Sequence, residues 1–120
     1  MTPAEFRVLR SSLGLSAQDV ARANEVALRT AQRWEVSHDP PADVQAWLLD
    51  KWALVADRVG DVIDLAERGE PIRLISYRDD ATAFERQGMS ASEHTALLGH
   101  ICMALEPVSY THLTLPTKRI

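Results

Sequence analysis

Apolar residues in the first part of the chain recur at spacings of three and four, the period of an α-helix that buries one face. These residues are Phe6, Leu9 and Leu13. Thr2 can cap the N-terminus of such a helix, and Glu5 can bond back to the cap. Because Gly14 can take the left-handed conformation, the pattern predicts a helix that begins at Pro3 and ends before Gly14.

Two shorter helices are predicted next, joined by a turn of a few residues. Ser16 can cap the first, over residues 17–23, and Asn24 can end it because Asn tolerates the left-handed region. The other, over residues 28–35, turns Ala31 and Trp34 toward the core. Its outer face is polar and consists of Arg29, Thr30, Gln32 and Arg33. Prolines at positions 40 and 41 end this part of the chain.

A much longer helix is predicted over residues 42–68, where apolar residues repeat every three to four positions until Gly69 and Pro71 interrupt them. Residues 72–77 are short, β-branched and aromatic, which predicts a strand. The acidic pair at positions 79 and 80 favours a short helix, and the capping box Ser90-Ala91-Ser92-Glu93 favours a last one. The inward residues of that last helix are Leu97, Leu98, Ile101 and Leu105.

The composition is that of one ordinary globular domain or two very small ones: 120 residues, 46% hydrophobic and 25% charged. No apolar run approaches the roughly 18 residues of a membrane span, and the N-terminus lacks a signal pattern, so we expect a cytoplasmic protein without membrane contact. The single cysteine, Cys102, allows no internal disulfide and has no Cys or His at metal-site spacing.

The net charge of −4 is unevenly distributed. Residues 1–38 carry five arginines against four acidic residues, whereas residues 39–69 carry three basic residues against seven acidic ones. Because a nucleic-acid-binding surface needs a basic patch, the N-terminal third is the part of the chain suited to contact phosphates.

Three short helices with a tight turn before a polar third helix are typical of a helix-turn-helix. The matching positions are Leu13-Gly14-Leu15-Ser16, Val20-Ala21, Val26, Arg29-Thr30 and Arg33-Trp34-Glu35. They resemble the repressor-type helix-turn-helix of phage repressors and their bacterial relatives. A wider pattern adds residues 2–7, Pro40, and Tyr77-Arg78-Asp79-Asp80 before Phe84. Over about residues 2–105 the chain resembles the family of the anti-CRISPR-associated autorepressor and its YdiL-like relatives.

This resemblance implies a homodimeric transcriptional regulator with an N-terminal DNA-binding part, a C-terminal dimerisation part and no cofactor. The fold class expected is mainly α. Residues 1–41 would form a helix-turn-helix bundle that packs on the start of the long helix, and residues 42–106 a small α+β dimerisation part with one short strand. Residues 107–120 resemble an ending that recurs spuriously on unrelated automatically translated sequences, so we expect a non-native or disordered tail; the alternative is an edge strand that pairs with residues 72–77.

Residue chemistry supports DNA recognition by the third helix. Arg29 and Arg33 lie one turn apart, and arginine pairs bidentately with guanine in the major groove. Thr30 can meet a thymine methyl group, and Gln32 can contact a base or the backbone. The alternative for both arginines is a solvated surface without a partner. Glu35 is expected to cap or to pair with Arg10, since phosphate would repel it.

The second helix is expected to contact the DNA backbone, because its capped N-terminus aims N–H groups at phosphate. Ser16 and Gln18 suit that role. Three positions depart from the repressor pattern: Ala17 replaces a DNA-contacting Gln, Glu25 the turn Gly, and Ala27 a capping Ser or Thr. These departures predict weak binding by a monomer and a requirement for two-fold pairing.

Dimerisation is expected because the long helix and the lone strand each need an apolar partner. The predicted interface consists of Trp52, Val55, Val59, Ile72, Leu74 and Tyr77. The alternative is that these residues are buried only within one chain, against the helix of residues 90–105. A symmetric dimer would place two recognition helices roughly 34–36 Å apart, to read an inverted repeat.

Two function classes follow from these patterns. The leading hypothesis is a sequence-specific DNA-binding regulator, a homodimeric repressor or autorepressor of double-stranded DNA sites. The alternative is an antitoxin-like adaptor for RNA or protein, which the acidic residues 39–106 motivate. An enzyme is not expected: His94 and His100 do not share a helical face, Cys102 adjoins an inward residue, and no catalytic or metal-binding pattern is present.

Overall fold

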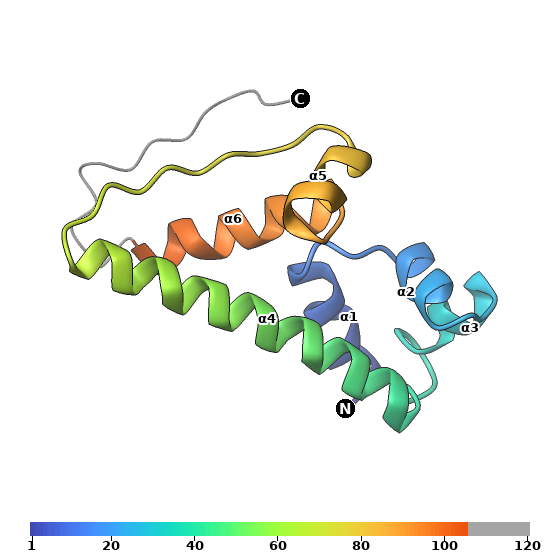
Figure 1. Ribbon diagram of the computed structural model, residues 1–120. Helices are drawn as coiled ribbons and strands as arrows, with labels where there is room; N and C mark the ends of the chain where they lie inside the picture. The colour runs from blue at the N-terminus through green and yellow to red at the C-terminus, as the bar shows by residue number, and fades with distance from the viewer. Residues whose placement is uncertain (106–120) are drawn as a thin grey trace. The chain divides into compact units, whose positions relative to one another are not determined.

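The structure of the chain is a computed structural model, and residues 1–105 are described (Figure 1). This part of the chain is mainly helical, with six helices and no sheet. It divides into two compact units, one comprising Met1–Leu54 and the other beginning at Val55. The division lies inside the long helix α4 (Ala42–Glu67), so the first half of α4 belongs to unit 1 and the second half to unit 2.

Unit 1 contains α1 (Pro3–Ser12), α2 (Ala17–Ala23) and α3 (Leu28–Arg33) before α4 begins. The predicted capping box of α1 is confirmed, because the Glu5 backbone N–H donates to Thr2 Oγ1 and the Thr2 N–H donates to Glu5 Oε1. These bonds hold the pKa of Glu5 below its usual value. Gly14 has a φ of 74° and ends α1 as predicted. The third helix is shorter than predicted, since Trp34–Ser37 form turns.

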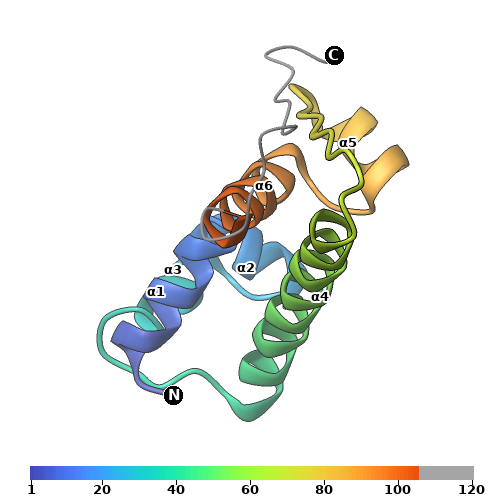
Figure 2. The same cartoon turned by 90° about the vertical axis from the view of Figure 1, so that its left-hand side faces the viewer.

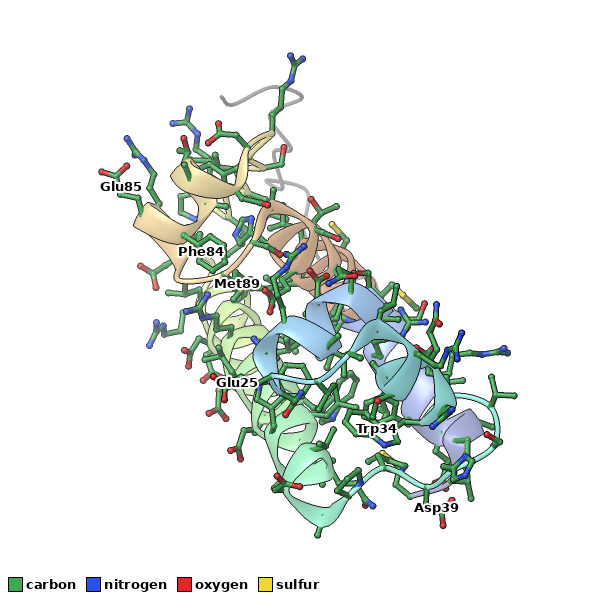
Figure 3. The ribbon with its side chains drawn as sticks, turned by 90° about the vertical axis from the view of Figure 1, so that its right-hand side faces the viewer. Glu25, Trp34, Asp39, Phe84, Glu85 and Met89 are labelled. Atoms are coloured by element: carbon green, nitrogen blue, oxygen red, sulfur yellow. The ribbon has the colours of Figure 1, made fainter. Side chains whose placement is uncertain are left out.

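The core of unit 1 forms where apolar residues of its four helices meet. Phe6 is fully buried, and its ring meets that of Trp34 edge-on, with the centroids 6.4 Å apart. Trp34 is 7% exposed, which confirms the inward orientation predicted for it (Figure 3). Val20 and Leu48 complete this core with no exposed surface. The packed aromatic pair fixes the inner side of α3, so its other side remains outward.

Unit 2 contains the second half of α4, α5 (Asp80–Gln87) and α6 (Ala91–Leu105). The Thr82 backbone N–H donates to the Asp79 carboxylate, which caps α5 and keeps the pKa of Asp79 below its usual value. The predicted capping box of α6 is confirmed by reciprocal bonds between Ser90 and Glu93. α6 lies beside the second half of α4 (Figure 2). Its predicted inward residues Leu97, Leu98, Ile101 and Leu105 are all buried.

The predicted strand over residues 72–77 is not confirmed, so the expected α+β character of the C-terminal part is absent from residues 1–105. The segment consists of strand-forming residue types, but among residues 1–105 it has no partner strand, and Arg73 alone is assigned to a β-bridge. Ile72 and Leu74 are instead buried in the core of unit 2, while Arg73 between them is exposed.

None of the helices within residues 1–105 combines the length and the apolarity that a membrane crossing requires. α4 has the length, but charged residues interrupt it throughout. The expectations for residues 107–120 lie outside the described residues.

Candidate nucleic-acid interface

The connection between α2 and α3 is a tight turn stabilised by backbone hydrogen bonds. The Val26 N–H donates to the Ala21 carbonyl at 3.0 Å, and the Glu25 N–H donates to the Arg22 carbonyl at 3.4 Å. This pair of bonds is the Schellman motif, which requires a left-handed residue after the cap. Glu25 occupies that position with a φ of 55°, and within residues 1–105 no other non-glycine residue has a positive φ (Figure 3). Position 25, where a repressor-type turn usually has glycine, is thus the position that takes the left-handed conformation.

The N-terminus of α3 lacks a side-chain cap. Ala27 stands at the N-cap position and has no side-chain oxygen, so only its carbonyl takes part, as acceptor from the N–H groups of Thr30 and Ala31. The short helix is therefore held by packing, with Ala31 fully buried and Trp34 nearly so. A missing cap costs about 1 kcal/mol, which the buried side of α3 must offset.

The outer side of α3 presents an uncommitted polar surface. Arg29, Gln32 and Arg33 are exposed, and their side chains make no hydrogen bond or ion pair to any described residue. Thr30 is half-buried beside them. Two guanidinium groups one helical turn apart, both in water and both unpaired, can approach a large anionic partner without breaking an existing contact.

The start of α2 differs from its predicted role. Ser16 Oγ accepts from the Asp19 N–H at 3.0 Å, and the Asp19 carboxylate accepts from the Ser16 N–H at 2.7 Å. Ser16 therefore caps the helix, as predicted, and Asp19 places a negative charge at the end where a phosphate was expected. Gln18 is exposed and free to contact a backbone. The two reciprocal bonds form a capping box, and the three-residue spacing of Ser16 and Asp19 in the sequence is a signal that could have predicted it.

Glu35 is joined to Arg10, as the sequence predicted. Arg10 Nη2 lies 2.8 Å from Glu35 Oε1, and the side chains are 17% and 9% exposed. Arg10 also donates to the carbonyl of Leu15. This pair fastens the residue that follows α3 to α1, and it neutralises an acid that would otherwise repel phosphate.

The six residues predicted for a dimer interface do not form one exposed stripe. Val55, Ile72 and Leu74 are buried within the single chain, Val59 and Tyr77 are half-buried, and Trp52 is 38% exposed. Leu49, one turn before Trp52 on the same side of α4, is 48% exposed. Leu49 and Trp52 thus expose neighbouring apolar surface on α4, and Leu49 was not among the residues that the sequence indicated.

No group of three or more His, Cys, Asp or Glu side chains within residues 1–105 is arranged to hold a metal ion. Comparison with models of known protein families and with the sequences of characterised proteins gives no significant match.

Proposed function

We propose that unit 1 is a helix-turn-helix that binds double-stranded DNA in a sequence-specific manner, and that the protein is a transcriptional regulator. One observation carries the proposal: Arg29, Gln32 and Arg33 are exposed and unpaired on the side of α3 opposite the packed residues Ala31 and Trp34. In this motif the third helix enters the major groove, where arginine reads guanine through two hydrogen bonds.

The α2–α3 turn supports this interpretation. A left-handed residue at position 25 reproduces the backbone that a glycine provides in repressor-type turns, although the side chain here is glutamate. The pairing of Glu35 with Arg10 supports it as well, because it removes one negative charge from the vicinity of the recognition helix. The resemblance to the anti-CRISPR-associated autorepressor family belongs to the same proposal.

The regulator acts as a homodimer that reads an inverted repeat. A six-residue recognition helix without a side-chain cap offers few contacts, so one copy binds weakly and a second is needed. Leu49 and Trp52 provide exposed apolar surface for such pairing. Two recognition helices then contact half-sites about one duplex turn apart, roughly 34–36 Å.

The proposal is tested by selecting bound duplexes from random DNA and measuring their affinity for variants. We expect an enriched inverted repeat and an affinity that falls steeply with salt. The double variant Arg29→Ala, Arg33→Ala should bind about 30-fold or more weakly, because each bidentate contact contributes roughly 1–3 kcal/mol. The matched control Arg68→Ala, Arg86→Ala removes two exposed charges from unit 2 and should bind normally.

Equal affinity of the double variant and the wild type would contradict the proposal. Enrichment of RNA but not of duplex DNA in a parallel selection would replace it with the adaptor function.

A further inference from the structure

Unit 2 contains a pocket of about 300 Å³ between the second half of α4, the segment 73–77 and α6. Its apolar walls consist of Val62, Leu74, Ile75, Leu97, Leu98 and Ile101. Six side chains with hydrogen-bonding groups also line it: Arg58, Asp61, Arg73, Tyr77, Gln87 and His94. A mostly apolar cavity with a few convergent polar groups is the usual form of a small-molecule site.

Two of these polar groups are buried without a partner. His94 is only 5% exposed, and its Nδ1 has no hydrogen-bond partner among residues 1–105. Arg58 Nη1 is buried and equally unsatisfied within that range, although Nη2 donates to the Gln87 carbonyl at 3.3 Å. Since buried polar atoms in folded proteins are nearly always hydrogen-bonded, two such atoms on residues that line one pocket make this pocket a candidate ligand site.

The pocket offers several hydrogen-bond donors alongside the carboxylate of Asp61. Tyr77 accepts from Gln87 Nε2 at 3.2 Å, which leaves its own hydroxyl proton available. The centroids of the Tyr77 and His94 rings lie 5.2 Å apart, so the two side chains are neighbours in the pocket lining. Burial and the nearby charge of Arg58 lower the pKa of His94, so its imidazole is neutral at pH 7 and one ring nitrogen carries a proton.

The charges that line the pocket select a monoanion. Arg58 and Arg73 bring two positive charges and Asp61 one negative charge, which leaves one positive charge when His94 is neutral. A planar carboxylate matches a guanidinium in geometry, whereas a phosphate dianion exceeds the available charge and has no apolar part for the walls.

We propose that this pocket binds a small monocarboxylic acid, with the carboxylate at Arg58, Tyr77 and His94 and an aliphatic or aromatic body against Leu97 and Ile101. The site lies wholly within unit 2 and does not depend on the DNA-binding function proposed for unit 1.

The test uses the full chain, benzoate and hexanoate as probes, and the amide resonances of residues 73–105 as the readout. We expect saturable shifts with both acids and at least 10-fold weaker binding of benzamide, hexanamide and inorganic phosphate. Arg58→Met should weaken benzoate binding at least 10-fold and Tyr77→Phe about threefold. Arg68→Met changes an exposed arginine of unit 2 outside the pocket and should leave binding unchanged.

Absence of saturable shifts with either acid would overturn the proposal, as would equal affinity for acid and amide or for benzoate and phosphate. If Arg58→Met fails to fold, two measurements still test the proposal. They are the comparison of acid with amide binding in the wild type and the titration of Tyr77→Phe. Loss of DNA binding would leave these results untouched, so the two proposals fail separately.

Discussion

Arg29 and Arg33 of unit 1 and Arg58 of unit 2 carry the same guanidinium group in opposite surroundings. Arg29 and Arg33 are exposed on α3, and their side chains form no hydrogen bond or ion pair with any described residue. Arg58 lies partly buried on α4, donates to a backbone carbonyl of Gln87 and keeps one nitrogen unsatisfied in a pocket. An exposed guanidinium retains its hydration, whereas a buried one has lost it without full compensation.

This difference separates two kinds of partner. Cations in water, spaced along a helix, suit a large polyanion that covers them only on binding. A partly buried cation that lines a cavity with Tyr77 and His94 suits a small ligand that fits the cavity and completes its hydrogen bonds. Arg10 is a third case: the chain itself supplies partners for its two terminal nitrogens through Glu35 and the Leu15 carbonyl, while Nε has no partner among the described residues.

Removing the partner of Arg10 should have the largest effect on stability. Glu35→Ala leaves a mostly buried guanidinium without its carboxylate, and we expect unit 1 to lose about 2 kcal/mol of unfolding free energy. All three tryptophans lie in residues 1–54, so their fluorescence during urea unfolding reports on unit 1. The control Glu85→Ala, an exposed site on α5, should change it by less than about 0.5 kcal/mol (Figure 3). An unchanged midpoint in Glu35→Ala would show that the pair contributes nothing.

Adding the missing N-cap should stabilise α3, which carries the polar surface. Ala27→Ser provides an oxygen for the free N–H groups of the first turn, and we expect a gain of about 1 kcal/mol in the same urea titration. Ala27→Val has no such oxygen and serves as the control, with no gain expected. Equal midpoints for the serine variant and the wild type would mean that α3 does not need a cap.

Replacing the left-handed Glu25 by glycine should raise the unfolding free energy by a smaller amount. Glu25→Gly removes the steric cost at a φ of 55°, partly offset by the greater chain entropy of glycine, for a net stabilisation of roughly 0.5–1 kcal/mol. Glu25→Ala removes the same charge but keeps the strain, so it should not stabilise. If the alanine variant gained as much as the glycine variant, the charge and not the backbone would be the cause.

The stability of unit 2 should depend on pH through the protonation of His94. Its pKa is lowered from the ordinary value of 6.5, so below pH 6.5 the unfolded chain takes up a proton that the folded unit does not. The stability of unit 2 should therefore fall as the pH drops below 6.5 and be independent of His94 above it. Urea unfolding monitored by the amide resonances of α6 at pH 7.5 and 5.5 measures this fall. The variant His94→Gln should lose less stability over this interval; an identical loss would contradict the assignment.

The sequence predicted the elements whose signals are local. Thr2 with Glu5, Gly14, Ser16 and Ser90 all mark helix ends that the structure contains, because capping depends on residues three or four positions apart. The strand over residues 72–77 is not confirmed within residues 1–105, because residue types that favour strands do not by themselves supply a partner strand.

The pocket of unit 2 was missed because it joins residues from distant parts of the chain. Arg58 and His94 are brought together only by the packing of α4 with α6. A partial signal existed, since His94 precedes Leu97, Leu98 and Ile101 at the spacings of their buried face. A histidine at the first position of an inward stripe marks a polar group that needs a partner.

The most direct test of the central claim replaces single guanines in a selected duplex with 7-deazaguanine, which lacks the N7 acceptor that arginine reads. At the contacted positions the wild type should lose about 10-fold in affinity, whereas the Arg29→Ala, Arg33→Ala variant should lose nothing further. Equal losses in both proteins, or no loss in the wild type at any guanine, would contradict recognition of DNA by the outer side of α3.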